Sequence, residues 1–209
     1  FNKLFNNCEF IETITFKKFY RNNIKDMSYM FNNCLWLKEL NLTNFKTNKV
    51  TNMNHMFYGC IALKNLNLSN FDTSNVIDMS FMFCRCKSLK KLNIGNYNTK
   101  NVQNISHMFE KCVSIDYLNI SNFNTNNVTD MSYMFFQCPL LKKLEITNFT
   151  FNNEKNIEYM FSECSEELKN KIRVLYPNLG YKAFDDVNLL LDNSDLSLSN
   201  SSDDDNNED

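Results

Sequence analysis

Cysteine is the chemically reactive residue that this sequence places most regularly. Seven of the eight cysteines recur at one constant interval, and they are Cys8, Cys34, Cys60, Cys86, Cys112, Cys138 and Cys164. Zinc sites draw their ligands from close local spacings such as Cys-x-x-Cys, and no histidine accompanies this column, so we expect no metal. Each Cys lies one turn after an apolar residue pair. We therefore favour thiols buried as small hydrophobic side chains, with disulfides between neighbouring repeats as the alternative.

Cys84 stands outside this column. The residues that occupy its position in other repeats are Asn32, Tyr58, Glu110, Phe136 and Ser162. A position that accepts such varied side chains is expected to be exposed. We therefore predict that Cys84 is the thiol that reacts with alkylating agents.

Histidine could act as a general acid or base, and the chain has two, His55 and His107. Aromatic residues take their place in the other repeats, namely Tyr29, Phe81, Tyr133 and Tyr159. A catalytic histidine needs a second group within hydrogen-bond reach, whereas these two histidines stand two repeats apart. We interpret the column as a surface ladder of aromatic-sized side chains, and we expect neither catalysis nor a cofactor.

The unit that positions these side chains is a repeat centred on Met-Phe-x-x-Cys. It occurs in full six times between Met30 and Cys164, and residues 4–8 form a weaker seventh copy. The step from one copy to the next never varies, which is typical of stacked-repeat proteins, in which each unit buries its apolar face against its neighbours. Within a repeat the apolar residues follow helical spacing, as in Val50, Met53, Met56, Phe57 and Cys60. An Asp or Asn stands directly before the second of these residues, so we predict a short helix from that N-cap to the Cys.

After the Cys the spacing changes to L-x-x-L-x-L, as in residues 63–68, which indicates a short strand. Six such blocks occur, and a helix between consecutive strands implies that they pair in parallel. The predicted fold is an α/β solenoid: a right-handed, leucine-rich-repeat-like stack with a narrow parallel sheet on one side and short helices on the other. An Asn-aromatic step such as Asn70-Phe71 follows most strands. Its Asn is expected to bond backbone groups of the loop and to share such bonds between neighbouring repeats, and its aromatic ring to fill the core.

The combination of L-x-x-L-x-L, Asn-Phe and Met-Phe-x-x-Cys resembles the BspA-like leucine-rich-repeat surface proteins, including the related mycoplasma lipoprotein repeats. The resemblance covers residues 4 to about 164. It implies a leucine-rich-repeat solenoid from a family that consists largely of cell-surface proteins thought to bind host or matrix proteins. It brings no catalytic residues with it. A cell-surface or secreted location is an expectation from this resemblance alone.

The pattern divides the chain into three regions. Residues 1–164 are expected to form a solenoid of about six and a half repeats, whose N-terminal cap is missing because the chain opens inside a repeat. Residues 165–192 are expected to form a C-terminal helical cap, in which Ser165 begins a helix that runs to about Tyr176. Residues 193–209 are expected to be a disordered acidic tail. Residues 1–184 hold all 22 basic residues, so we hypothesise that this tail folds back onto lysines of the solenoid.

Solenoids usually bind partners through a concave sheet face, whose outward side chains have no core role. The candidate ligand-binding residues on this face are Lys38, Glu39, Lys64, Asn65, Asn67, Lys90, Lys91, Asn93, Tyr117, Asn119, Lys142 and Lys143. The Asn side chains either bond to one another along the stack or present their amides to a partner. Lysines occur in every repeat and only Tyr117 interleaves with those of this face, so nucleic acid is not expected as a partner.

We therefore predict a non-enzymatic protein-interaction scaffold, a monomer that binds a partner protein through this face in surface adhesion or in host- or matrix-protein binding. The alternative is an intracellular structural or regulatory repeat protein that binds another protein, a reading motivated by the thiol column. No apolar run reaches the roughly 18 residues of a membrane span.

Overall fold

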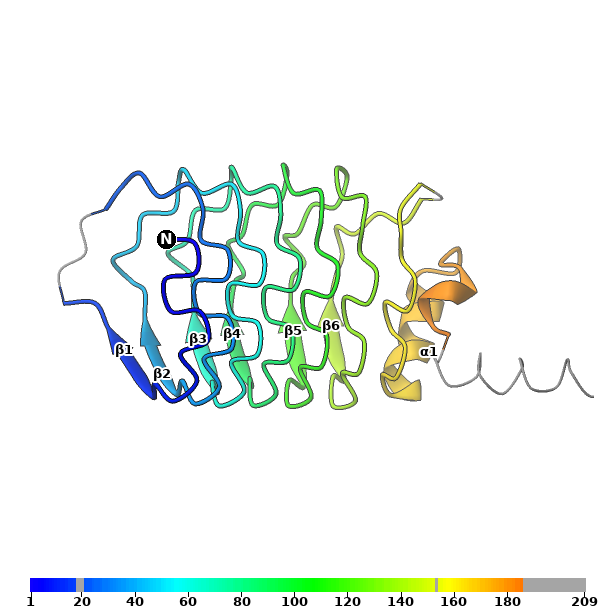
Figure 1. The fold of residues 1–209 in the computed structure, drawn as a ribbon. Coiled ribbons are helices and arrows are strands. Elements are labelled where there is room, and N and C mark those ends of the chain that lie inside the picture. Colours follow the sequence, from blue (N-terminus) through cyan, green and yellow to red (C-terminus); the bar gives the residue numbers. More distant parts are fainter. Residues whose placement is uncertain (18–20, 153, 186–209) are drawn as a thin grey trace, which may run out of the picture.

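The computed structural model describes residues 1–17, 21–152 and 154–185. It is an elongated stack in which the strands lie side by side in chain order, with α1 at the end opposite β1 (Figure 1). The elements are β1 Thr13–Thr15, β2 Glu39–Asn41, β3 Asn65–Asn67, β4 Lys91–Asn93, β5 Tyr117–Asn119, β6 Lys143–Glu145, α1 Glu166–Leu175 and the 3₁₀ helix η1 Tyr181–Ala183. Every strand begins at the same position of its repeat. Small parallel strand pairs repeated along the chain therefore build a solenoid-like repeat architecture.

Each strand is three residues long, and its central residue faces the core. Leu66 at the centre of β3 is buried, whereas Asn65 and Asn67 on either side of it are exposed. The pairing is parallel, with Asn65 opposite Lys91 and Asn67 opposite Asn93. The prediction of one continuous sheet is wrong, because the described strands form three separate pairs, β1-β2, β3-β4 and β5-β6. Three-residue strands share few hydrogen bonds, so a small change in the approach of two repeats breaks their pairing.

The prediction of a short helix in each repeat is also wrong. Residues 27–34 make consecutive turns instead, the last of which is closed by a 3.2 Å bond from the Cys34 N–H to the Phe31 oxygen. The third residue of two of these turns has a positive φ, 57° at Tyr29 and 55° at Asn33, as in type II turns. The equivalent two positions have a positive φ in every repeat. A right-handed helix cannot contain such residues, because its backbone requires a φ of about −63°.

A backbone ladder takes the place of the predicted helices. The Met53 N–H donates to the Asp78 oxygen at 2.9 Å, and the Phe57 N–H donates to the Met82 oxygen at 2.9 Å. The parallel bridges of this ladder join Asp26, Asn52, Asp78, Asn104, Asp130 and Asn156 without a break. The expected helix caps support turns instead, since Asp78 Oδ1 accepts the Ser80 N–H at 2.8 Å. The uninterrupted hydrogen-bonded side of the stack is thus the side that was expected to be helical.

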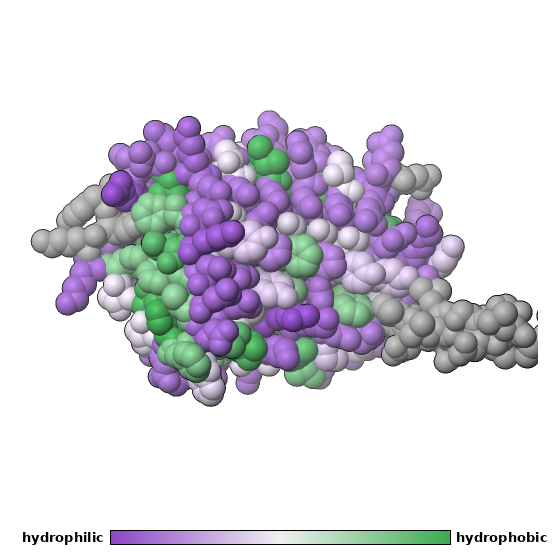
Figure 2. Space-filling model, in the orientation of Figure 1, coloured by the Kyte–Doolittle hydropathy of each residue, from purple (hydrophilic) through white to green (hydrophobic). Residues whose placement is uncertain are grey.

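The core consists of side-chain columns that run through the stack, as the period predicts. The Phe rings of the central column stack at centroid distances of 5.5–5.7 Å from Phe5 to Phe161. All ten methionines are fully buried. The thiol of Cys60 is buried and donates to the Phe31 oxygen at 3.2 Å, and its equivalents up to Cys164 do the same one repeat apart. The buried-thiol prediction is confirmed from Cys34 to Cys164, whereas Cys8 at the end of the column is half-buried. The outward side chains on the face in Figure 2 are mainly hydrophilic.

Two further columns join the repeats on the remaining side. Asn122 Nδ2 donates to the Tyr97 oxygen at 2.6 Å, which confirms the role predicted for the Asn of the Asn-aromatic step. A buried threonine column, not singled out from the sequence, adds a second link. Thr99 Oγ1 accepts the Asn124 N–H at 2.7 Å and donates to the Asn124 oxygen at 2.9 Å. Backbone groups that lack a strand partner are therefore satisfied by side chains of the neighbouring repeat.

The C-terminal helix is confirmed, since α1 begins after Ser165, whose Oγ accepts the Leu168 N–H at 3.3 Å. The following segment continues the ladder, because the Phe161 N–H donates to the Ala183 oxygen at 2.7 Å. Phe184 then stacks on Phe161 with ring centroids 5.7 Å apart. The last core layer is covered by this segment. The remainder of the expected cap and the whole of the expected acidic tail lie outside the described residues.

Candidate interaction face

All twelve residues expected to form the binding face are exposed. They lie on one side of the stack because each strand turns only its middle residue toward the core. Four lysines directly precede a strand: Lys38, Lys64, Lys90 and Lys142. Five residues begin a strand, namely Glu39, Asn65, Lys91, Tyr117 and Lys143, and three end one, namely Asn67, Asn93 and Asn119. Their exposure agrees with the prediction, and their role in binding stays a prediction.

Half of these residues line a single open groove of about 790 Å³ across β3, β4 and the start of β5. We call it the central groove. Its polar lining from the predicted set is Asn65, Asn67, Lys90, Lys91, Asn93 and Tyr117. Leu40, Leu66, Leu92 and Asp116 complete it, so leucines form its floor.

The leucine floor follows from the interruption of the sheet. The middle residue of the first strand of each pair is buried, as at Leu66 and Leu118, whereas that of the second strand is only half-buried, as at Leu40 and Leu92. The second strand of each pair has no paired neighbour on its C-terminal side, and its central leucine is half-buried there. The breaks between β2 and β3 and between β4 and β5 therefore open apolar surface within an otherwise polar face. Sequence reasoning missed this feature, because all six strand blocks follow the same pattern.

The central groove carries excess positive charge. Lys90 and Lys91 form no ion pair with any residue in the described part of the chain, and Asp116 is the acid in the lining. Tyr117 is 45% exposed and its hydroxyl lies 3.3 Å from Glu145 Oε1. The Lys143 ammonium lies 4.9 Å from the centre of the Tyr117 ring. Tyr117 is thus held at one end of the groove by two residues of β6.

The hydrogen bonds of the Asn side chains distinguish bonding along the stack from amides that face outward. Asn67 Oδ1 accepts the Ser69 N–H at 3.1 Å, and Asn119 Oδ1 accepts the Ser121 N–H at 3.0 Å. These bonds stay within one repeat and close the turn after the strand. The Asn residues therefore do not bond to one another along the stack, and their amide N–H groups face no partner among the described residues. They are free to donate to a ligand.

The remaining predicted residues lie outside the central groove. Lys142 and Lys143 line a second groove beside α1. Lys38 forms an ion pair with Glu12 at 2.9 Å. Glu39, Lys64 and Asn119 are exposed but line neither groove. The twelve predicted residues therefore divide into separate neighbourhoods instead of one continuous site.

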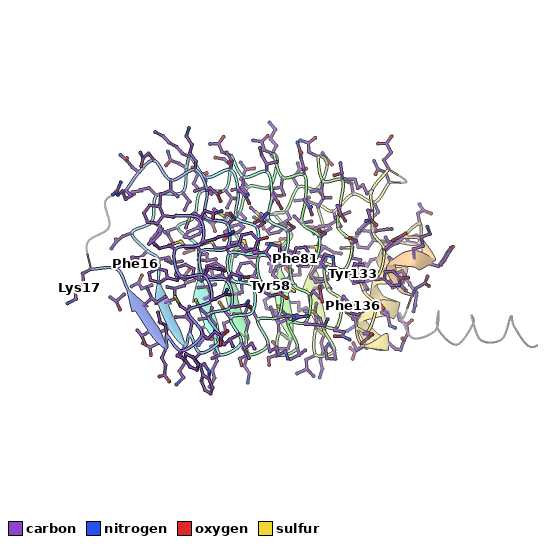
Figure 3. The ribbon with its side chains drawn as sticks, in the orientation of Figure 1. Phe16, Lys17, Tyr58, Phe81, Tyr133 and Phe136 are labelled. Carbon is purple, nitrogen blue, oxygen red and sulfur yellow. The ribbon has the colours of Figure 1, made fainter. Side chains whose placement is uncertain are left out.

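A row of stacked rings occupies the ladder side, as the sequence predicts. The rings lie 4.2–5.0 Å apart, in the order Tyr29, His55, Phe81, His107, Tyr133 and Tyr159. Figure 3 shows Phe81 and Tyr133 in this row, with Tyr58 and Phe136 beside it. Burial lowers the pKa of His55, since the charged form loses water. Because each ring covers the face of the next, the rings within the row expose only their edges, and a ligand could not stack on their faces.

Cys84 is 1% exposed, so the prediction of a reactive surface thiol is wrong. Its column is covered because the backbone ladder turns this position toward its neighbours, and Glu110 beside it is buried as well. Burial would raise the pKa of Glu110, but hydrogen bonds from His107 at 2.6 Å and Lys111 at 2.8 Å hold it at about 2. Burial also raises the pKa of Cys84. A catalytic cysteine needs a lowered pKa, so this cluster favours structure over catalysis.

Among the described residues, no group of His, Cys, Asp or Glu is arranged to hold a metal ion. Neither helix in that part of the chain has the length and apolar character of a membrane span.

Comparison with known proteins identifies one family. Residues 1–92 and residues 85–174 each match the family described as "Mycoplasma protein of unknown function, DUF285". Each matched stretch holds more than three of the repeats seen in the structure. No curated protein and no solved structure matches the chain.

Proposed function

The chain belongs to the family of Mycoplasma proteins of unknown function, DUF285, and we propose that it is a non-enzymatic scaffold that binds another protein through the strand face. The observation that carries this proposal is the central groove. It combines a leucine floor with lysines and free amide donors. Lys90 and Lys91 form no ion pair with any residue in the described part of the chain, so no contact within the stack accounts for their presence.

The chemistry of the groove indicates the partner that would fit. Leu40, Leu66 and Leu92 provide apolar contact, while Lys90 and Lys91 favour carboxylates. The free Asn amides would donate to backbone carbonyls of a bound segment. A protein segment that carries both apolar and acidic side chains is therefore the proposed ligand. Tyr117 is the proposed anchor, because it is the exposed aromatic side chain of the groove lining and tyrosine is one of the residue types that most often dominate binding energy.

We also propose that the repeats are related to the BspA-like leucine-rich repeats and wind in a right-handed sense. The L-x-x-L-x-L block of each strand supports this relationship. On that basis the first choice of partner is a host or matrix protein met at the cell surface. The second choice is an intracellular partner of a regulatory repeat protein, which the column of buried free thiols supports.

The proposal is tested by measuring binding of the full chain to a panel of purified matrix and host-surface proteins by surface plasmon resonance. Two groove variants are compared with the wild type, Tyr117→Ala and the double change Lys90→Glu with Lys91→Glu. The control is Lys46→Glu with Lys100→Glu, which makes the same change of charge at exposed positions outside the groove. We expect a loss of about tenfold or more in affinity for each groove variant, which corresponds to about 1.4 kcal/mol.

The control should bind within about twofold of the wild type if the groove is the site. An equal loss in the control would mean that binding depends on overall charge. Retention of full affinity by both groove variants would reject the central groove as the binding site. Binding to none of the panel, together with full alkylation of the thiols after denaturation without reductant, would favour the intracellular alternative.

A further inference from the structure

A second groove, the terminal groove, lies between β6 and α1 and has a volume of about 700 Å³. Its floor is apolar and includes Leu144, Val174 and Leu175. Val174 is 81% exposed and Leu175 is 65% exposed, on a helix whose opposite side packs on the core. No residue in the described part of the chain covers them. Two neighbouring aliphatic side chains at such exposure on one groove wall indicate a surface that is covered by another segment.

The rim of the terminal groove is basic. Lys143 forms an ion pair with Glu145 at 3.0 Å, and Lys171 forms one with Glu167 at 2.6 Å. Lys142 forms no ion pair with any residue that the structure describes. The groove thus presents an uncompensated positive charge beside an apolar floor. It fits a segment in which leucine-like side chains alternate with carboxylates.

The described chain ends close to this groove. Its last residues lie against α1, since the Arg173 guanidinium stands 4.6 Å from the centre of the Phe184 ring. A helix with its side chains is about 10–12 Å across, and a chain can span about 3.3 Å per residue. The path around α1 is about half its circumference, roughly 16–19 Å, so about five residues beyond Asp185 suffice to pass from one side of α1 to the other. Residues from about 190 onward are within reach of the terminal groove.

The sequence at that point has the composition that the groove requires. Residues 189–198 read Leu-Leu-Leu-Asp-Asn-Ser-Asp-Leu-Ser-Leu, with five leucines, two aspartates and no basic residue. The more acidic residues 199–209 contain no apolar side chain. Only the segment 189–198 therefore matches both the floor and the rim.

We propose that residues 189–198 bind in the terminal groove of the same chain, with their leucines on the α1 and β6 side chains and with Asp192 and Asp195 near the lysines of the rim. This inference does not rest on the proposed function. It does bear on it, because Lys142 and Lys143 also belong to the predicted binding face. The bound segment would cover the C-terminal end of that face and leave the central groove open.

Zero-length carbodiimide crosslinking of the full chain tests the proposal, since it joins a carboxylate to an ammonium group that it touches. We expect mass spectrometry at about 0.15 M salt, where the screening length is about 8 Å, to find Asp192 or Asp195 joined to Lys142, Lys143 or Lys171. The Glu167 to Lys171 crosslink is the internal control, because that pair is 2.6 Å apart and should form in every sample. A mixture of isotope-labelled and unlabelled chains separates links within one chain from links between two chains.

Two variants test whether the leucines direct the binding. The triple change of Leu189, Leu190 and Leu191 to Ser keeps every acid, and Val174→Asp alters a side chain that is already 81% exposed. Each should reduce the crosslinks to the terminal groove at least fivefold while leaving the control crosslink unchanged. The proposal would be overturned by crosslink yields that are unchanged in the serine variant, or by yields at Lys38, Lys64 and Lys90 equal to those at the terminal groove. Crosslinks found only between different chains, or no crosslink at all, would also overturn it.

Discussion

Truncation of one ring in the central Phe column tests the stacked architecture directly. Phe83 is fully buried, and its ring lies parallel to those of Phe57 and Phe109 with both centroids 5.6 Å away. Removing a fully buried Phe side chain costs about 3–5 kcal/mol through lost burial and the cavity that remains. Each stacked pair adds about 0.5–1.5 kcal/mol beyond burial. Together these contributions amount to about 4–8 kcal/mol, so we expect Phe83→Ala to lower the free energy of unfolding by at least about 4 kcal/mol.

Two matched changes divide this loss into its parts. Phe83→Leu keeps most of the buried volume but removes both stacking contacts, so a loss of about 1–2 kcal/mol is expected. Phe5→Ala removes a ring that is half-buried and stacks on one neighbour of its column, Phe31, at 5.6 Å. The loss there should be about 2 kcal/mol or less, because a partly exposed ring contributes less burial.

Urea unfolding followed by far-UV circular dichroism measures all three free energies, provided that the slope with urea is the same in each variant. A changed slope would show that part of the stack unfolds separately, which repeat proteins can do. Equal losses for Phe83→Ala and Phe5→Ala would refute the account. In that case each repeat would be stabilised from within, and the two neighbours of Phe83 would contribute nothing.

Three further perturbations have defined outcomes. Thr99→Val leaves two partly buried backbone groups of Asn124 unsatisfied and should cost about 1–3 kcal/mol in urea unfolding, whereas the exposed Thr129→Val should cost less than about 0.5 kcal/mol. Burial holds the pKa of His55 below its value in the unfolded chain. The unfolded chain therefore binds a proton at His55 more readily than the folded chain does, so stability should fall as pH drops below about 6.5. His55→Phe should reduce this fall in pH-dependent unfolding curves, and an unchanged curve would contradict the assignment. Native protein treated with iodoacetamide should be alkylated at Cys8 alone, because the other thiols, Cys84 included, are buried; any adduct at Cys84 would contradict its burial.

The sequence predicts those features of the fold that depend on residue type at a fixed position in the repeat. The Phe, Met and Cys columns lie where the period places them, and the strands coincide with the L-x-x-L-x-L blocks. The bonds made by Asn122 and the start of α1 at Ser165 also follow from local chemistry that a single repeat displays. The exposure of the eight face residues within the strands was predictable for the same reason, because alternation about the central leucine decides it.

The site itself depends on features that no single repeat displays. The central groove exists because β2 does not pair with β3 and β4 does not pair with β5, which leaves Leu40 and Leu92 half-buried. All strand blocks carry the same leucine pattern, so nothing in the sequence marks where the sheet is interrupted. The burial of Cys84 was missed for a related reason, since varied side chains in a column can be covered as well as exposed.

The spacing of the apolar residues by itself determined that equivalent side chains of successive repeats stack on one another and form one continuous core. Only the tertiary structure decided how the chain reaches those positions. A helix and a series of turns present Met53, Phe57 and Cys60 to the core with the same spacing, so periodicity cannot distinguish them. The turns require left-handed backbone at residues such as His55, which costs about 1–2 kcal/mol each. That cost is offset by the hydrogen bond from the His55 N–H to the Ser80 oxygen, a partner that becomes available only when the next repeat is in place.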